Sequence, residues 1–325
     1  MNSSSLRRTR RQSPLWVRLF LISTAVAAAA QAQAAPPSTD LTISVDVRLV
    51  ALQVTVRNGK GAIATGLGPQ NFKVYENGIL QTLRSFRAED IPVAVGLIVD
   101  HSGSMRSKLP DVTAAAVAFT RASNPEDDIF VVRFNEHVTL GLPDTKLFSA
   151  SPAELEHALM SAHPAGETAL YDAISSALTH IQKSAIDKKV LIVISDGGDN
   201  ASKISLEQAL HQIEESEVEV YTIGLFDADD PDINSHVLRH IASAGGGDAF
   251  LPKQSADAVR ICESIAKDIR TQYTLTYSPS DQAFHGEYRA IRVRVSGDNG
   301  ARLKARARAG YIASPMDMAG KQGRK

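Results

Sequence analysis

Apolar and polar residues alternate along the chain beyond residue 40. The stretch LTISVDVRLVALQVTVRNGKG, residues 41–61, places apolar side chains at nearly every second position and ends in a turn-forming sequence, which is typical of strands with one buried face. A second such stretch, FKVYENGILQTLRSF, is divided by Asn77-Gly78, a dipeptide that strongly favours a tight β-hairpin. After a short linker, APPSTD, we therefore expect residues 35–90 to form a β segment without helices.

The pattern changes at Pro92, where apolar runs begin to alternate with helical segments. The apolar runs are VAVGLIV, DIFVVRFNEHV, KKVLIVISDG and VEVYTIGL, and segments such as VTAAAVAFTRA, SPAELEHALMSAH and SLEQALHQIEESE lie between them. Strands that are apolar on both faces and alternate with helices are typical of a parallel sheet covered on both sides. The sequence thus predicts an α/β domain, a mostly parallel sheet with helices on both faces, over residues 91–272.

Alternation returns after residue 272, in QYTLTYSP, YRAIRVRVSG and ARLKARARAGYIA. We expect antiparallel strands over residues 273–313 and a disordered basic tail over residues 314–325. Because two β segments of about 50 residues would each bury little core alone, we favour one small β-sandwich built from both segments, with the α/β domain inserted between them. Two separate β appendages are the alternative.

Positive charges fall on alternate positions of these C-terminal strands, in RVRV (residues 292–295) and RLKARARAG (residues 302–310). Side chains two positions apart on a strand point to the same face, so these charges predict a solvated face. Binding of an acidic partner at that face is the alternative.

The first 34 residues have the composition of an export signal. Basic LRRTRRQSPLWVRLF, apolar LFLISTAVAAAA and small AQAQAA follow one another, which is the order of a secretory signal peptide. The uncharged stretch over residues 19–30 is short for a membrane span, which needs about 20 apolar residues. We predict a signal peptide over residues 1–34 and an exported protein, periplasmic or secreted. An uncleaved membrane anchor is the alternative, and we expect no other contact with a membrane.

Charge and cysteine content narrow the functions further. Residues 1–34 contain five of the 35 basic residues and none of the 36 acidic ones, so their removal leaves 30 basic residues and a mildly acidic chain. Nucleic-acid binding depends on a basic surface, and we exclude it.

Cys262 is the only cysteine, so the chain has no intrachain disulfide. Its place in SADAVRICESIAKDI suits the apolar face of a helix, and we expect a buried, unreactive thiol.

Polar side chains follow the strands of the predicted sheet in three places. Asp100, Ser102 and Ser104 come after VAVGLIV, Thr168 lies in PAGETALYDAI at the start of a helix, and Asp196 follows VLIVIS. Ligands of open α/β sheets bind beyond the carboxyl ends of the strands, so we expect these five side chains to meet there. All five offer oxygen, which hard divalent cations such as Mg²⁺ prefer. Two carboxylates and three neutral hydroxyls would leave the cation able to bind a carboxylate from outside.

Each of these residues also has a plainer explanation. Ser102 and Ser104 could cap the helix that follows them, and Thr168 could cap the next one. An aspartate before glycine, as at Asp196, is common in a plain turn. The coincidence of all three groups at strand ends of one sheet favours the metal site.

DHSGSM resembles the D-x-S-x-S motif of the von Willebrand factor type A domain, whose fold is also called the integrin I domain fold. GETALYDAI and ISDGGDN are similar to the second and third loops of that family, and the resemblance covers residues 90–275. It implies a Rossmann-like sheet and a metal-ion-dependent adhesion site. In that site the matching serines and threonine would ligate Mg²⁺, with Mn²⁺ or Ca²⁺ as alternatives. The aspartates would act directly or through water, and an Asp or Glu of a protein partner would complete the coordination. VDVRLVALQVTVRNGKG and FKVYENG resemble the β segment that precedes such domains in a group of exported bacterial proteins.

The leading hypothesis is an exported, non-enzymatic adhesion or interaction module that binds a protein through the metal. A metal-assisted hydrolase is the alternative, because a bound cation can activate water. It would need a general base, and His101, Glu167 and Asp199 are the nearby candidates. We expect His101 at the rim of the site rather than among the ligands. A scaffold with a functionally silent metal site is a third alternative.

Overall fold

The computed structural model describes residues 49–88, 90–226, 234–281, 286–297 and 302–313. All of these lie in one compact unit, residues 46–325. The predicted signal peptide and C-terminal tail lie outside the described residues. No helix among the described residues is long and apolar enough to cross a membrane.

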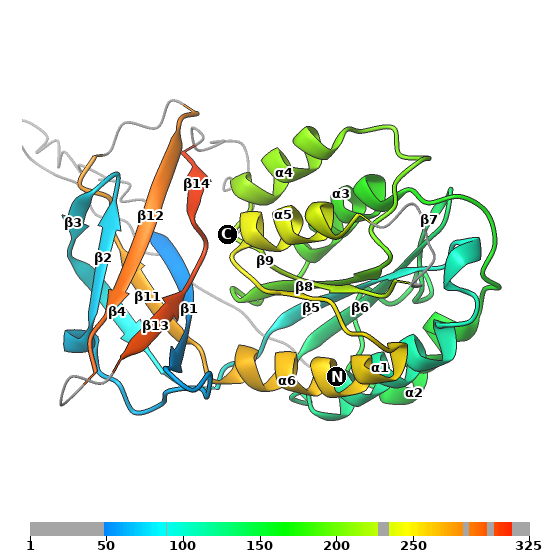
Figure 1. The fold of residues 1–325 in the computed structure, drawn as a ribbon, viewed down its shortest axis with the longest axis horizontal. Helices are drawn as coiled ribbons and strands as arrows, with labels where there is room; N and C mark the ends of the chain where they lie inside the picture. The colour runs from blue at the N-terminus through cyan, green and yellow to red at the C-terminus, as the bar shows by residue number, and fades with distance from the viewer. Residues whose placement is uncertain (1–48, 89, 227–233, 282–285, 298–301, 314–325) are drawn as a thin grey trace, which may run out of the picture. The chain divides into compact units, whose positions relative to one another are not determined.

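A six-stranded sheet forms the middle of the α/β domain (Figure 1). Its strands are β5 (Ala94–Asp100), β6 (Asp128–Phe134), β7 (Val138–Leu140), β8 (Lys189–Ser195), β9 (Glu219–Gly224) and β10 (Ala249–Phe250). Their order in space is β10-β9-β8-β5-β6-β7, and all neighbours are parallel except β6 and β7. β5 comes first in the chain yet lies between β8 and β6, so the strand order reverses at β5. Ligand sites of open α/β sheets lie at such a reversal, beyond the carboxyl ends of the strands.

Six helices of the described residues cover this sheet. They are α1 (Leu109–Arg121), α2 (Pro152–Met160), α3 (Leu170–Ile181), α4 (Leu206–Glu215), α5 (Ser235–Gly245) and α6 (Ala258–Arg270). Helices α1, α2 and α6 lie on one face and α3, α4 and α5 on the other (Figure 1). α1 packs against α2 and α6, and α4 packs against α3 and α5. The predicted α/β fold is therefore confirmed.

The sequence pattern suggests that DIFVVRFNEHV forms a single strand. The structure instead ends β6 at Phe134 and begins β7 at Val138. The side-chain oxygen of Asn135 accepts the N–H of His137 at 2.8 Å, which stabilises a tight turn. β7 then runs back antiparallel to β6 and forms one edge of the sheet.

Close packing at the centre of the sheet depends on a glycine. A Cβ at Gly96 of β5 would lie 2.5 Å from Leu191 Cδ2 and 2.6 Å from Phe130 Cζ, so large side chains of β8 and β6 fill the space above it.

Cys262 of α6 is fully buried in the same core, and burial raises the pKa of its thiol to about 12. The predicted buried thiol is confirmed.

The two flanking β segments form two four-stranded antiparallel sheets. Their strands are β1 (Val50–Asn58), β2 (Phe72–Glu76), β3 (Ile79–Gln81), β4 (Leu83–Arg87), β11 (Tyr273–Tyr277), β12 (Tyr288–Val295), β13 (Leu303–Arg306) and β14 (Gly310–Ile312). The orders are β13-β1-β11-β4 and β14-β12-β2-β3. Each sheet thus combines strands of both segments, and Leu52, Val74 and Leu275 belong to one shared core. The prediction of a single sandwich is confirmed.

The predicted hairpin lies between β2 and β3. Asn77 and Gly78 both adopt positive φ angles, 47° and 83°, as the favoured two-residue hairpin turn requires. The one departure from an all-β segment in the described part of residues 35–90 is a short 3₁₀ turn, η1 (Pro69–Asn71).

Arg306, which the alternation in RLKARARAG places on a solvated face, is held by the α/β domain. Its guanidinium donates to Glu219 Oε1 at 3.2 Å and to the Tyr221 hydroxyl at 2.9 Å, both on β9. The side-chain amide of Gln272 donates to the same carboxylate at 2.8 Å. This part of the prediction is wrong, because alternation along a strand does not reveal which face meets another element.

Candidate metal centre

The first loop of the candidate site begins where β5 ends. Asp100 is fully buried (0% exposed). Its Oδ1 accepts the N–H of Ser102 at 2.8 Å, and its Oδ2 accepts the hydroxyl of Ser195 at 2.7 Å. The chain then forms a short 3₁₀ turn, η2 (Gly103–Met105), directly after Ser102, and the hydroxyl oxygens of Ser102 and Ser104 lie 3.1 Å apart. The loop therefore directs both hydroxyls to one place.

The third loop follows β8, the parallel neighbour of β5. Asp196 Oδ2 accepts the hydroxyl of Ser104 at 2.5 Å, and Asp196 Oδ1 accepts the N–H of Gly198 at 3.2 Å. Adjacent parallel strands thus bring both carboxylate-bearing loops together, joined through Ser104.

The second loop is bound to both of the others through its backbone. The carbonyl of Gly166 accepts the N–H of Gly103 at 3.2 Å. Thr168, which is buried, donates its N–H to Asn200 Oδ1 at 2.8 Å, and its carbonyl accepts the N–H groups of Asn200 and Ala201. The structure therefore holds Thr168 against the third loop, and Gly166 connects the same second loop to the first.

Helix capping does not explain the three hydroxyl residues. α1 begins at Leu109, after Lys108, and no side chain caps it. Ser102 precedes η2 without a capping hydrogen bond from its side chain. α3 follows Ala169, again without a side-chain cap. The capping alternative is wrong for Ser102, Ser104 and Thr168.

The two carboxylates of the cluster are not paired with a basic side chain of the described residues. Burial raises the pKa of Asp100 to about 6, hydrogen bonds from Ser102 and Ser195 oppose this, and the charge of Asp196 raises it further. Among the described residues, no lysine or arginine forms an ion pair with either carboxylate. Ser104 is exposed, so the cluster is open to solvent on one side. Buried carboxylates beside hydroxyl oxygens, with no cation from the protein, suit a hard divalent ion.

The described part of the chain contains no group of three or more His, Cys, Asp or Glu side chains that could hold a metal ion. The five predicted residues do not form such a group, because only two of them are carboxylates. Their role as metal ligands stays a prediction.

The sequence predicts His101 at the rim of the site, and this prediction is wrong. His101 is buried, and its ring nitrogens lie 2.9 Å from the Leu159 carbonyl and 3.3 Å from the Val99 carbonyl. Burial lowers the pKa of its imidazole. His101 therefore connects the end of β5 to α2 through the backbone carbonyls of Val99 and Leu159.

Two further residues of the site are not identified by the sequence pattern. Ser195 bonds to Asp100 from the end of β8, and Asn200 bonds to the backbone of Thr168. Asp199 also has a positioning role, because its Oδ2 accepts the N–H of Tyr171 at 3.0 Å and the hydroxyl of Ser202 at 2.6 Å. The only signal in the sequence is their place beside Asp196, which does not distinguish them from ordinary loop residues.

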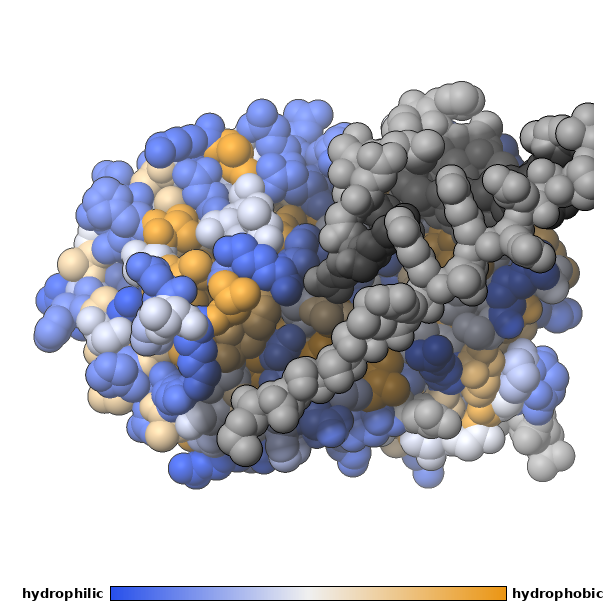
Figure 2. All heavy atoms as spheres, turned by 180° about the vertical axis from the view of Figure 1, so that it is seen from behind, coloured by the Kyte–Doolittle hydropathy of each residue, from blue (hydrophilic) through white to orange (hydrophobic). Residues whose placement is uncertain are grey.

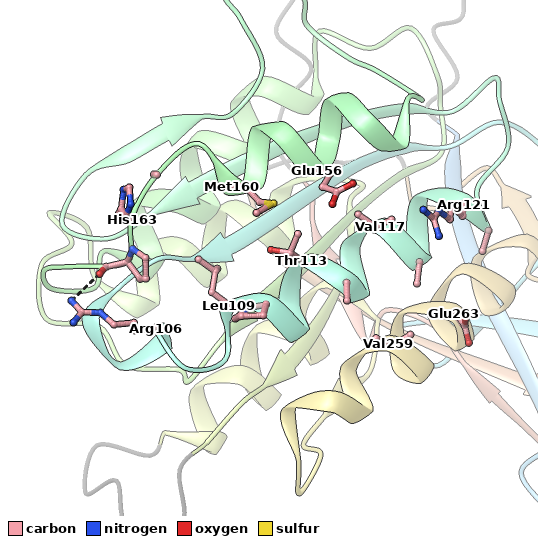
Figure 3. A pocket seen from close by; sticks show the side chains of 16 residues that line it. Arg106, Leu109, Thr113, Val117, Arg121, Glu156, Met160, His163, Val259 and Glu263 are labelled. Carbon is pink, nitrogen blue, oxygen red and sulfur yellow. Dashed lines mark hydrogen bonds between the residues drawn. The ribbon is translucent and has the colours of Figure 1, made fainter.

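A large groove on the described part of the α/β domain does not include this cluster. It is a groove of about 1070 Å³ along α1, between α2 and α6, and the apolar side chains of Leu109, Val117, Met160 and Val259 line it (Figure 3). Arg106 at one end donates to the carbonyl of Pro164 at 3.2 Å. None of the five predicted ligands lines the groove.

Apolar side chains also reach the surface elsewhere in the α/β domain. Seen from behind, its surface shows apolar side chains among polar ones (Figure 2). The large apolar side chains exposed in this domain are Leu140, Leu147 and Met160. Met160 belongs to the groove, whereas Leu140 lies on β7 and Leu147 in the loop that follows it.

The fold and the cluster define an α/β domain with an oxygen-lined site at the reversal point of its sheet. Residues 95–263 match the von Willebrand factor type A domain, so the chain belongs to this family, and the resemblance seen in the sequence is confirmed. No curated protein matches the chain.

Several solved structures are similar to this chain. A von Willebrand factor type A protein from Catenulispora acidiphila is 15% identical, over 85% of this chain and 76% of that one, with a TM-score of 0.50. BatB from Bacteroides thetaiotaomicron is 18% identical, over 55% and 97%, with a TM-score of 0.44. The manganese-loaded TRAP protein from Plasmodium vivax is 14% identical, over 74% and 98%, with a TM-score of 0.44. At 15% identity the first likeness shows the fold alone.

Proposed function

We propose that the chain is an exported, non-enzymatic interaction module that binds a protein partner through a divalent cation. The ligands of the cation would be Asp100, Ser102, Ser104, Thr168 and Asp196. The observation that carries the proposal is the use of the serine hydroxyls, which bond to each other and to Asp196 instead of capping a helix.

The two carboxylates of the cluster, Asp100 and Asp196, differ in how many hydrogen bonds hold them and therefore in how they would meet a cation. Asp100 is held by the Ser102 N–H and the Ser195 hydroxyl, which favours one orientation of its carboxylate. Within the described part of the chain, Asp196 accepts bonds only from Ser104 and Gly198, so it retains lone pairs for a cation. A bound Mg²⁺, with Mn²⁺ or Ca²⁺ as alternatives, would supply the positive charge that the two carboxylates lack and would bind an oxygen ligand from outside.

A carboxylate of a protein is the partner group that this site favours. A divalent cation beside three neutral hydroxyls attracts an additional anionic oxygen, and the exposure of Ser104 leaves room for an Asp or Glu side chain. The acidic balance of the chain after residue 34 disfavours nucleic acid. The signal-like sequence of residues 1–34 supports export, to the periplasm or the exterior.

The alternative of a metal-assisted hydrolase has less support. Of its three candidate bases, His101 is bound to two backbone carbonyls and Asp199 to a backbone N–H and a hydroxyl. Glu167 is exposed, and its carboxylate has no hydrogen bond from another described residue. A general base must reach the reacting water, and among the described residues no hydrogen bond joins the Glu167 side chain to the cluster.

Calorimetric titration of the full chain with Mg²⁺ and Mn²⁺ tests the proposal. Ser104→Ala is expected to weaken metal binding about tenfold or more. Ser107→Ala removes an exposed hydroxyl of the same loop and should bind metal as the wild type does. Equal binding by both variants would contradict the proposed site. Metal-dependent turnover of a phosphoester or peptide substrate, lost in Ser104→Ala, would favour the hydrolase.

A further inference from the structure

One face of the sheet β14-β12-β2-β3 carries three positive charges. Its basic face, as we name it, consists of the outward side chains of β2, β3 and β12, which are Lys73, Tyr75, Leu80, Tyr288, Ala290, Arg292 and Arg294. The inward residues between them are buried or half-buried, and Leu80 is 56% exposed. The face is therefore a surface of the sandwich and not part of its core.

The cations of the basic face have no acidic partner among the described residues. Arg289, on the inward side of the same strand, donates to Glu76 Oε1 at 3.0 Å and to Glu287 Oε1 at 2.8 Å. Arg292 forms no such ion pair with any described residue. The guanidinium of Arg294 lies 5.3 Å from the centre of the Tyr75 ring, a cation–π contact that leaves its charge uncompensated.

The register of the strands sets the spacing of these groups. Arg292 is paired with Tyr75, Arg294 with Lys73, and Tyr75 with Leu80. Side chains two residues apart on a strand are separated by about 6.8 Å. Alternate side chains of another extended chain have the same spacing, so acids at every second position can meet Arg292 and Arg294 together.

A hollow lies on this face next to the arginines. Its volume is about 280 Å³, and its lining residues are Tyr75, Gly78, Ala290, Ile291, Arg292 and Arg294. Gly78 and Ala290 have little or no side chain, which leaves the space open beside the Tyr75 ring. Ala290, Arg292 and Arg294 occupy alternate positions of β12 and all line the hollow, so the hollow runs along the row that contains the two arginines.

We propose that the basic face binds an extended acidic segment of a protein, with an apolar side chain in the hollow and carboxylates two and four residues further along. The carboxylates pair with Arg292 and Arg294, and Lys73 adds to the positive potential. Three cations are fewer than the clusters of four to eight that attract anionic membranes, and the acidic balance of the chain disfavours nucleic acid. This surface lies on the sandwich and does not depend on a cation.

A pair of peptides tests the spacing. Ac-SLSESES-NH₂ places leucine and both glutamates on one side of an extended chain, and Ac-SLSSEES-NH₂ has the same composition with the glutamates on opposite sides. Binding to the full chain is measured by fluorescence anisotropy with EDTA present, at about 0.01 M salt, where screening is weak. The first peptide is expected to bind about tenfold more tightly than the second, and its binding should weaken as salt is added. Equal affinity for the two peptides would overturn the proposal.

Variants locate the binding surface. Arg292→Glu combined with Arg294→Glu should weaken binding of the first peptide about tenfold or more, and the two Arg→Lys changes should keep part of it. Arg84→Glu reverses an exposed charge on β4, in the other sheet, and should have no effect. Equal loss in Arg84→Glu would overturn the proposal, and so would tighter binding of an oligonucleotide or of phosphatidylserine vesicles. Unchanged thermal unfolding shows that each variant is folded.

Discussion

The hydroxyl of Ser195 is expected to hold Asp100 in the orientation that the metal site needs, and Ser195→Ala tests this. Ser195 is fully buried at the end of β8. It donates to Asp100 Oδ2 at 2.7 Å and accepts the N–H of Gly197 at 3.0 Å. The substitution removes both hydrogen bonds and adds no volume.

The expected magnitude follows from these two bonds. A hydrogen bond to a charged group contributes about 1.5–3 kcal/mol, and a buried donor left without a partner costs about 1–3 kcal/mol. Because the two losses share one side chain, we expect the free energy of unfolding to fall by about 2–4 kcal/mol in metal-free buffer. Affinity for Mg²⁺ should fall about 10–100-fold, as it does when other side chains that orient a metal ligand are removed.

Two measurements on the full chain separate positioning from packing. Urea unfolding followed by circular dichroism gives the stability, and calorimetric titration gives the metal affinity. Ser107→Ala, in the exposed part of the first loop, should change neither value. If Ser195→Ala lost stability but bound Mg²⁺ within about twofold of the wild type, Ser195 would only support the core and the reasoning would be refuted.

Three further predictions concern the core. Gly96→Ala should lower the free energy of unfolding by about 1–3 kcal/mol, since the added Cβ overlaps Leu191 and Phe130; a loss below about 0.5 kcal/mol in urea unfolding would show that the core repacks freely. Burial lowers the pKa of Lys188 to about 8, so between about pH 8 and 10 the folded state lacks a proton that the unfolded state still binds. The stability of the wild type relative to Lys188→Met should therefore rise by about 2–3 kcal/mol over that range, and a difference that does not change with pH would contradict the lowered pKa. Cys262 should resist a water-soluble disulfide reagent in the native protein and react fully in urea; rapid labelling of the native protein would place the thiol at the surface.

The central strands and the candidate ligands are predictable from the sequence for the same reason. A strand buried on both faces excludes polar side chains, so β5, β8 and β9 stand out as apolar runs, and the polar residues after them mark the edge of the sheet. Asp100 and Asp196 could be placed on that edge without knowledge of any contact between them. The hairpin at Asn77-Gly78 is equally local, because its signal is the backbone preference of two adjacent residues.

Features that depend on distant residues could not be predicted in this way. The bond between Ser195 and Asp100 joins positions 95 residues apart, and the contact of His101 with Leu159 spans 58. The inward position of Arg306 depends on Glu219, which is 87 residues earlier in the chain. In each case the residue type fits several environments, and only the tertiary arrangement selects one of them.

The strand order of the sandwich also constrains how the protein folds during synthesis. β1 lies between β11 and β13, and its Leu52 is opposite Leu275. A ribosome therefore releases β1 more than two hundred residues before either neighbour of that strand exists, whereas the α/β domain has all its strands by the end of α6. Contacts of such long sequence separation form slowly, and until they form, the edges of the N-terminal strands remain open to wrong pairing. The α/β domain can thus fold first and bring the two halves of the sandwich together, which makes its folding a condition for completing the rest of the protein.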